Sequence, residues 1–545
     1  MVKERKNMID CLFIGYNNMK MENYKSAIKA FEALRLNKFF KWAPMNSNLY
    51  MLYKIINTSW FKYNNTPYSG FELYEKFHSN RLRESSILST AISYLSTFIE
   101  RRGFSFDYVN SFTDERETLA EKLKKNDFMA IAISTTFIVE DKPVQEIIKF
   151  IRKYNNTAKI IIGGPYILKQ GENRKKRDYS SFLKHLNADF FIVNSQGEGA
   201  LVELLSAIKN KSGFEGIKNI VYKVGDNYVS NPTESENNKL EDNTVDWSLF
   251  SDKLSELSII STSRSCPFEC AFCDFHVIGG NYQTSSPEAI EKELNTLKST
   301  GKVKYLFFTD DTFNIPPAKF KSTLKMMIKN NYNFKWTSFI RCQYLDDETL
   351  QLMKESGCEG ALLGLESANQ SVLDKMNKKA TVEGYKKGLD LLNKYDIESC
   401  ASFIIGFPGE TRETANDTVR FIEECKPTYY RLNLWMCIPY SPVYNRRKEY
   451  NIKGEGLLWS HSTMDAKTAS SIIQDAYLSI KNSIYLPVFD FDTLSLFNQG
   501  IRPEQIREFL KLFNVAVRER LTNPKSKGIS KELWDEIVKA CSRTA

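Results

Sequence analysis

The sequence lacks a long hydrophobic run, a secretory signal and a block of basic residues, and each absence excludes a class of protein. No apolar segment approaches the roughly 20 residues that a membrane-spanning helix needs. The first residues, MVKERKNMID, have neither the apolar core nor the cleavage site of a secretory signal. We therefore expect a soluble, cytoplasmic protein without a membrane partner.

Charge and cysteine usage are consistent with this expectation. The 75 Lys and Arg exceed the 66 Asp and Glu by 9, but they are mixed with acidic residues along the whole chain. Because no basic block could follow a phosphate backbone, nucleic-acid binding is disfavoured. The ten cysteines stand in a long chain without a secretory signal, so we expect free thiols and no disulfide framework.

Strand and helix signals alternate in the first part of the chain. Strands are expected at 10–16, 104–110, 128–134, 159–164 and 189–194, and helices at 87–102, 114–125, 142–154, 178–186 and 198–208. Such alternation predicts a parallel sheet covered on both faces, which is a doubly wound, Rossmann-like α/β domain, here over residues 1–235.

Residues 17–86 interrupt this domain as an insertion that is rich in aromatic side chains. The aromatic residues could cap a large planar ligand, although such residues more often build a core or a domain interface. The polar segment after residue 230 lacks apolar periodicity, and we expect a linker at 236–256.

A second alternating series begins directly before a run of cysteines. Strands are expected at 257–260, 305–309, 335–341, 360–365, 399–405 and 429–434, with helices between them. Six such strands predict a partial (β/α)6 barrel over residues 257–440, with active groups at the carboxyl ends of the strands. Residues 441–545 are expected to form a mainly helical substrate or cap region.

Three closely spaced cysteines are the strongest chemical signal. Cys266, Cys270 and Cys273 follow a C-x3-C-x2-C spacing, and Phe272 directly precedes the last of them. Soft sulfur ligands select iron–sulfur clusters or zinc. A structural zinc site takes four protein ligands, and no second Cys or His pair stands nearby in the right register. The spacing therefore predicts a cluster in which one iron has no protein ligand.

Polar residues stand where the predicted barrel strands end. Asp310 and Asp311 follow the second strand and could accept hydrogen bonds from an ammonium group. Arg341 ends the third strand, and its forked guanidinium suits a carboxylate. Glu366 and Ser367 follow the fourth strand, where they could bond ribose hydroxyls or a methionyl group.

The fifth strand ends at Ile405 and Gly406, and the bare glycine suits close approach of an adenine edge. Taken singly, each of these strand-end residues also fits a helix cap or a solvated charge.

The cysteine run resembles the signature of the radical S-adenosylmethionine (radical SAM) superfamily. The resemblance implies that Cys266, Cys270 and Cys273 hold a 4Fe-4S cluster whose open iron chelates the amino and carboxylate groups of S-adenosylmethionine. The strand-end residues and Phe272 are similar to cofactor-binding positions of that superfamily.

The first domain resembles the cobalamin-binding module that precedes the barrel in many of these enzymes. The residues that carry the resemblance are Tyr16, Asn17, Ser134, Thr135, Thr136, Gly163, Gly164, Pro165, Gly197 and Glu198. The G-x-G-x-x-G run of a nicotinamide fold is absent after the first strand. Neither histidine of the first domain, His78 or His185, lies in a D-x-H-x-x-G motif, and the one such run, Asp274–Gly279, follows the cysteine triad outside that domain. Cobalt is therefore expected to lack a protein imidazole below it, as in the methyltransferase class.

Beyond the barrel, Tyr440 and His461 are candidate catalytic residues that could face a substrate. A structural role is the alternative for His461, because an isolated histidine is often part of the packing. The runs 133–137 and 459–464 are similar to those of a subgroup that includes phosphinate P-methyltransferases of natural-product pathways.

The resemblance as a whole implies a cobalamin-dependent (class B) radical SAM methyltransferase. Its substrate would be a small molecule or a peptide with an unactivated carbon or phosphorus centre, and a flavodoxin or ferredoxin would supply electrons. A radical SAM cyclase or oxidoreductase that moves no methyl group is one alternative. A non-enzymatic cobalamin sensor or carrier is another, although it would not need the cysteine triad.

Overall fold

The computed structural model describes residues 7–15, 51, 54–77, 87–173, 176–487, 493–498 and 500–542. The chain divides into two compact units. The first comprises Met1–Met19, Arg83–Ser265 and Phe275–Val303, and the second comprises Lys20–Leu82, Cys266–Asp274 and Lys304–Ala545.

The first unit contains a seven-stranded sheet with the order β4-β1-β5-β6-β7-β8-β9. Its strands are β1 (Met8–Ile14), β4 (Phe106–Val109), β5 (Asp127–Ser134), β6 (Lys159–Gly163), β7 (Phe190–Ile192), β8 (Ile220–Val224) and β9 (Asn227–Ser230). The first five strands in this order pair in parallel, as predicted. The antiparallel hairpin of β8 and β9, which extends the sheet beyond β7, was not predicted.

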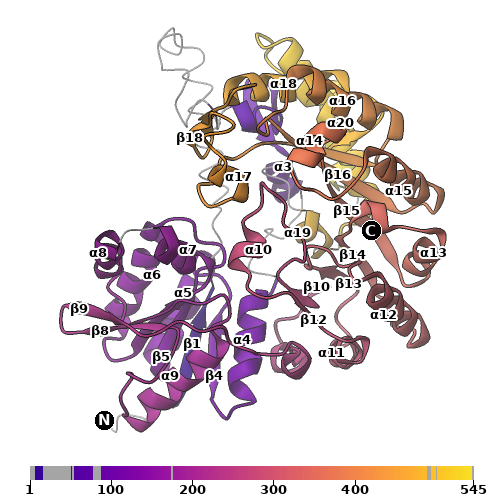
Figure 1. Ribbon diagram of the computed structural model, residues 1–545. Coiled ribbons are helices and arrows are strands. Elements are labelled where there is room, and N and C mark those ends of the chain that lie inside the picture. Colours follow the sequence, from indigo (N-terminus) through magenta and orange to yellow (C-terminus); the bar gives the residue numbers. More distant parts are fainter. Residues whose placement is uncertain are drawn as a thin grey trace. The chain divides into compact units, whose positions relative to one another are not determined.

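Helices cover both faces of this sheet. Successive strand residues point to opposite faces, and they are apolar on both. Leu12 and Ile14 pack in one core with residues of α5 (Arg116–Lys125), α6 (Asp141–Tyr154), α7 (Pro165–Asn173) and α8 (Lys176–Leu186). Helices α4 (Thr90–Glu100) and α9 (Glu198–Asn210) lie against the other face (Figure 1). The predicted helices are confirmed, and α7 is an addition to them.

In the second unit, neighbouring parallel strands follow the order β13-β14-β15-β16-β17-β20. They are β13 (Tyr305–Phe308), β14 (Lys335–Phe339), β15 (Cys358–Glu366), β16 (Glu398–Ile405), β17 (Tyr429–Leu434) and β20 (Ile484–Tyr485). The helices between them are α12 (Pro317–Lys329), α13 (Asp347–Glu355), α14 (Gln370–Lys375), α15 (Val382–Lys394) and α16 (Arg412–Cys425). The predicted strands are confirmed, and the predicted strand at 257–260 is β10 (Leu257–Ile260). The short strand β20 was not predicted.

The region after the barrel strands is mainly helical, as predicted, with α18 (Ala466–Ser479), α19 (Thr493–Asn498), α20 (Pro503–Thr522) and α21 (Lys531–Ser542). The described part of the aromatic insertion contains β2 (Trp60–Tyr63), β3 (Thr66–Ser69) and α3 (Gly70–Phe77), and it packs on α20 and α21. Trp60 and Phe61 are buried there, and Tyr63 stacks on Trp534 at 4.3 Å between ring centroids. These aromatic residues therefore build core.

One buried arginine joins the insertion to α20. Arg520 donates hydrogen bonds to Trp60 O at 3.0 Å and to Asn57 Oδ1 at 2.9 Å, and its guanidinium carbon lies 3.8 Å from the centroid of the Trp60 ring. The carbonyl groups of a chain turn are thus satisfied by a side chain from a helix far along the sequence.

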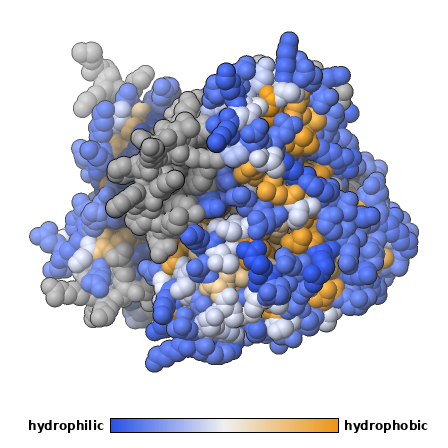
Figure 2. Space-filling view, turned by 90° about the horizontal axis from the view of Figure 1, so that it is seen from above, coloured by the Kyte–Doolittle hydropathy of each residue, from blue (hydrophilic) through white to orange (hydrophobic). Residues whose placement is uncertain are grey.

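No helix in the described part of the chain is long and apolar enough to cross a membrane. Figure 2 shows hydrophilic residues over most of the visible face, with hydrophobic residues in separate patches.

We expect Arg520→Met to lower the free energy of unfolding by roughly 2–4 kcal/mol, because it leaves buried carbonyl oxygens without a donor. Urea unfolding followed by circular dichroism measures the change. Arg420→Met is the matched control, since the Arg420 side chain is 65% exposed on α16. Equal stability of the two variants would contradict the stabilising role that we give to the Arg520 hydrogen bonds.

Candidate cofactor sites

The cysteine triad lies in an irregular segment whose backbone is anchored on both sides. Ala271 N donates to Met376 O and Val443 N donates to Ala271 O, both at 2.8 Å. Asn377 Nδ2 donates to Glu269 O at 2.7 Å. Main-chain hydrogen bonds therefore hold this segment in place.

Two of the three cysteines of the triad differ from the other cysteines in exposure. Cys266 and Cys273 are half-buried, whereas Cys270 and the seven cysteines outside the triad are buried. Desolvation raises the pKa of Cys266, and the positive charge of Arg341 opposes this shift. Among the described residues, no three Cys, His, Asp or Glu side chains stand together as a ligand set. That the three cysteines bind a cluster therefore stays a prediction, which rests on the chemistry of thiols and on the spacing of these residues.

Arg341 lies beside the triad with a buried donor that has no partner. Its guanidinium carbon is 3.5 Å from the centroid of the Phe268 ring, and its NH2 group donates to Lys378 O. Its Nε is buried, and no acceptor among the described residues bonds it. Asn314 bonds the Arg341 backbone twice, at 2.9 Å each, and so fixes the residue. An unsatisfied buried donor fits the predicted carboxylate of a bound S-adenosylmethionine.

Glu366 ends β15 in a left-handed backbone conformation, with φ of +67°. Its carboxylate pairs with Lys378 Nζ at 3.1 Å. A Cβ at Gly364 would lie 2.6 Å from Glu366 Oε1, so the glycine makes room for this carboxylate. Lys378 Nζ also lies 5.6 Å from the centroid of the Phe272 ring. The hydroxyl of buried Ser367 accepts a hydrogen bond from Asn369 N at 3.2 Å.

The two aspartates after β13 form a concentrated negative charge. Asp310 is buried. Desolvation of the carboxyl, with the charge of Asp310 adding to it, raises the pKa of Asp311 to about 6. Desolvation lowers the pKa of Lys319 on α12 to about 8, and Asp310 opposes that shift. A bound ammonium group would relieve the repulsion between the aspartates.

Gly406 and His461 come together behind the turn that follows β16. Gly406 has φ of +95°, and a Cβ there would collide with the Trp459 ring. The His461 ring stacks on Trp459, with its Nε2 3.0 Å from Gly406 O, while Thr463 N donates to its Nδ1 at 3.3 Å. Desolvation lowers the pKa of His461, which favours a neutral ring with both nitrogens bonded.

These contacts make His461 part of the packing behind Gly406. Ile405, which precedes the glycine, is buried. Tyr440 is half-buried and stands just before the N-terminus of α17 (Pro442–Asn445). Catalytic roles for Tyr440 and His461 stay predictions.

A buried glutamate in the same turn was not among the predicted site residues. Glu410 is fully buried, and the backbone N–H groups of Gly406 and Phe407 donate to its carboxyl. Its other oxygen, Oε1, has no partner among the described residues. Burial raises the pKa of Glu410 to about 8. The carboxyl is therefore protonated at neutral pH.

In the first unit, the predicted cobalamin residues of β5 and β6 divide into a buried and an exposed set. Thr135 is buried, and its N and Oγ1 donate to Gly163 O at 2.9 and 2.8 Å. Gly164 has φ of +109°, and a Cβ there would lie 2.9 Å from Thr135 Oγ1. The hydroxyls of Ser134 and Thr136 lie 2.9 Å apart in exposed positions.

The same sheet edge carries exposed apolar surface and a cavity. Phe137 is 55% exposed directly after the Ser134–Thr136 run. A cavity of about 520 Å³ is lined by residues after β7, among them Asn194 and Ser195, and by Tyr179, whose buried hydroxyl has no hydrogen-bond partner among the described residues. Pro165 is exposed at the start of α7. An apolar edge beside a polar cavity fits a corrin with a polar tail.

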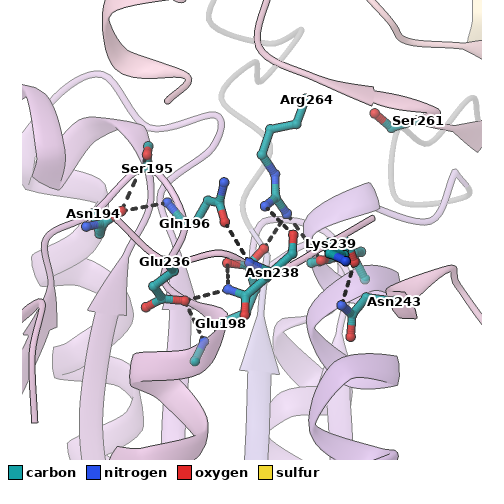
Figure 3. Close-up of polar contacts among 12 residues, drawn as sticks. Asn194, Ser195, Gln196, Glu198, Glu236, Asn238, Lys239, Asn243, Ser261 and Arg264 are labelled. Carbon is teal, nitrogen blue, oxygen red and sulfur yellow. Dashed lines mark hydrogen bonds and ion pairs between the residues drawn. The ribbon is translucent and has the colours of Figure 1, made fainter. Parts of the chain in front are cut away.

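The N-terminus of α9 is satisfied by the chain itself. Gly199 N and Ala200 N donate to the Glu236 carboxylate at 2.7 and 3.0 Å. Figure 3 shows Glu198 beside Asn238 and Arg264, with Arg264 pairing with the Glu198 carboxylate. A Cβ at Gly197 would collide with the Ile192 side chain.

Glu236 lies in the predicted linker, and neither it nor Arg264 was predicted to belong to a site. Cobalamin contacts of Gly197 and Glu198 stay predictions, and Tyr16 and Asn17 lie outside the described residues.

Comparisons with known proteins agree with both units. Residues 260–422 match the Radical SAM superfamily model, and residues 83–180 match the B12 binding domain model. An uncharacterized methyltransferase of Pyrococcus horikoshii is 25% identical over 66% of this chain and 80% of its own length. The anaerobic magnesium-protoporphyrin IX monomethyl ester cyclase of Cereibacter sphaeroides is 25% identical over 66% of this chain. This chain spans 60% of that cyclase.

A solved structure shows the same fold. The radical S-adenosylmethionine methyltransferase TsrM from Kitasatospora setae, with cobalamin and a [4Fe-4S] cluster bound, aligns with a TM-score of 0.55 and 18% identity, over 67% of this chain and 72% of that one. The domain matches define this chain as a radical SAM enzyme with a B12-binding domain. It is homologous to methyltransferases and to magnesium-protoporphyrin cyclases, and its cofactors are a 4Fe-4S cluster, S-adenosylmethionine and cobalamin.

Glu410→Gln should flatten the pH dependence of stability. Between its ordinary pKa near 4.5 and its native pKa of about 8, Glu410 keeps in the folded state a proton that the unfolded chain releases. The stabilisation is therefore complete below 4.5 and is lost as pH rises to about 8, by a few kcal/mol at most. Urea midpoints between these limits measure it. Glu413→Gln, an exposed neighbour, should keep the wild-type slope.

Proposed function

We propose that this chain is a cobalamin-dependent (class B) radical SAM methyltransferase that acts on an unactivated carbon or phosphorus centre of a natural product or peptide. The observation that carries the proposal is the order of two domain models in one chain, a B12-binding domain at 83–180 and a radical SAM domain at 260–422. The similarity to a methyltransferase over most of that relative's length supports methyl transfer.

The strand-end residues of the second unit supply the binding groups that this function needs. Cys266, Cys270 and Cys273 would hold the cluster. Arg341, whose buried Nε has no acceptor in the part of the chain that the structure describes, would bind the cofactor's carboxylate, and the Asp310–Asp311 pair would bind its ammonium group. When bound, the cluster supplies an electron for cleaving S-adenosylmethionine, and cobalamin supplies a methyl group.

Other residues would orient the nucleoside. Glu366 is held by Lys378 at the end of β15, where its second oxygen can accept from a ribose hydroxyl. Gly406, whose missing Cβ gives space to the Trp459 ring, would present its backbone to an adenine edge. In the first unit, the exposed hydroxyls of Ser134 and Thr136 and the Gly163–Pro165 turn would contact cobalamin.

A cyclase that transfers no methyl group is the second candidate function. The similarity to magnesium-protoporphyrin cyclases from two organisms favours it, although this chain spans only 60% and 65% of those relatives. Enzymes of either class need a substrate and a reductant. We propose a flavodoxin or ferredoxin as the electron donor.

Methyl loading separates the two functions without knowledge of the substrate. Anaerobic protein with a reconstituted cluster and cobalamin is incubated with reduced flavodoxin and methyl-labelled S-adenosylmethionine. We expect 5′-deoxyadenosine, S-adenosylhomocysteine and labelled methyl on cobalamin by mass spectrometry. Deoxyadenosine without S-adenosylhomocysteine would favour the cyclase, and neither product would overturn both.

The cysteine triad provides the control for this assay. Changing Cys266, Cys270 and Cys273 together to alanine should abolish iron binding and deoxyadenosine formation. Cys425→Ala, at a buried cysteine on α16, should retain both. Zinc in place of iron in the wild-type protein would contradict the proposal.

Arg341→Lys should weaken S-adenosylmethionine binding by about ten-fold, because lysine keeps the charge but loses the forked donor. Isothermal titration under anaerobic conditions measures the dissociation constant. The control Arg420→Lys, exposed on α16, should bind like the wild type. If Arg341→Lys binds S-adenosylmethionine with unchanged affinity, another residue binds the carboxylate of the cofactor.

A further inference from the structure

The second unit encloses a chamber that the proposed function does not use. Its volume is about 300 Å³, and strands β13 to β17, α19 and α20 contribute to its lining. Phe307, Phe339 and Leu362 supply apolar walls. The rings of Phe307 and Phe339 meet edge to face, with centroids 5.8 Å apart. A planar apolar group fits such walls.

The strand register explains why these residues share one chamber. Phe307 pairs with Thr337, which pairs with Gly360, and Gly360 pairs with Glu398, so this row crosses four strands. A second row runs from Phe339 through Leu362 and Cys400 to Tyr429. Residues two apart on a strand point to the same face, so both rows line one side of the sheet.

The chamber extends along the strands from their amino ends toward the ends that carry the predicted cofactor residues, and Phe339 in its wall stands two residues before Arg341. Glu398 begins β16, and Ile405 ends this strand of 8 residues directly before Gly406. At about 3.3 Å per residue, the two ends are roughly 23 Å apart. The end of the chamber at Glu398 is therefore far from the predicted cofactor residues, whereas its wall at Phe339 comes near to them.

Arg431 brings a positive charge to this apolar space. It lines the chamber, and its Nε is buried without a hydrogen-bond partner among the described residues. The ion pairs of the described residues include none for Arg431, whereas Glu398 pairs with Arg507 at 3.1 Å. Burying a guanidinium beside apolar walls costs free energy unless an anion pairs with it.

The neighbouring acid limits the charge of that anion. The carboxylate of Glu398 also lines the chamber, and Tyr429 hydrogen-bonds to it. This negative charge would repel a dianion such as a phosphate ester. One guanidinium fork matches a single carboxylate instead.

We propose that this chamber binds a small aromatic carboxylate, whose ring packs between the phenylalanine and leucine walls and whose carboxylate pairs with Arg431. The site goes beyond the proposed function, since neither cluster, S-adenosylmethionine nor cobalamin takes part in it. A binding measurement needs no turnover, so its failure would leave the methyl-transfer proposal untouched.

The test uses 3-phenylpropionate and its neutral amide as probes, titrated calorimetrically into the anaerobic holoenzyme. The carboxylate should bind at least about ten-fold more tightly than the amide, since a hydrogen bond to a charged group is lost in the amide. Arg431→Met should abolish this preference. Arg420→Met, on the exposed face of α16, should keep it.

A second variant tests the location independently of charge. Gly360→Ala should weaken both probes by reducing the volume of the chamber, and a Cβ at Gly360 meets Thr337 Cγ2 at an ordinary 3.5 Å, so an alanine fits there without a clash. Equal binding of acid and amide, no binding at millimolar concentration, or wild-type binding by both variants would overturn the proposal.

Discussion

The candidate site of the second unit depends on one buried arginine that joins three segments. Arg341 follows β14 by two residues, stacks on Phe268 of the cysteine segment and donates to the carbonyl of Lys378. Lys378 in turn pairs with Glu366 at the end of β15. Removing the guanidinium would therefore disturb the loop that holds the thiols, the end of one strand and the carboxylate at the end of another.

The sequence predicted the parts of the fold that depend on local pattern. Apolar runs such as 128–134 and 190–192 are buried strands because parallel strands covered on both faces need apolar residues at nearly every position. In the second unit each crossover from β13 to β17 places the next strand alongside, whereas in the first unit β5 pairs with β1 and not with β4, which only the folded chain reveals. The hairpin of β8 and β9 was missed because its strands are short and partly exposed.

The site was predicted only where a residue stands at a strand end or in a known spacing. Glu366 and Arg341 satisfy that condition. Lys378 lies in a loop between α14 and α15, and Glu410 lies in a turn, so no periodicity marks either residue. Their importance comes from burial and from partners distant in sequence, which only the folded chain reveals. His461 shows the reverse case, in which a chemically suggestive residue proves to be packed and hydrogen-bonded on both nitrogens.

The residues that cap the N-terminus of α9 show how far the first unit extends along the sequence. Glu236 supplies the acceptor for two amide groups at that helix terminus, and Arg264 neutralises a glutamate that is only 5% exposed. A fragment cut after residue 235 would leave those amides to water and strand a buried anion without its cation. The stretch up to Arg264 is thus an integral portion of the cobalamin module, and any dissection of the enzyme into halves must keep it attached.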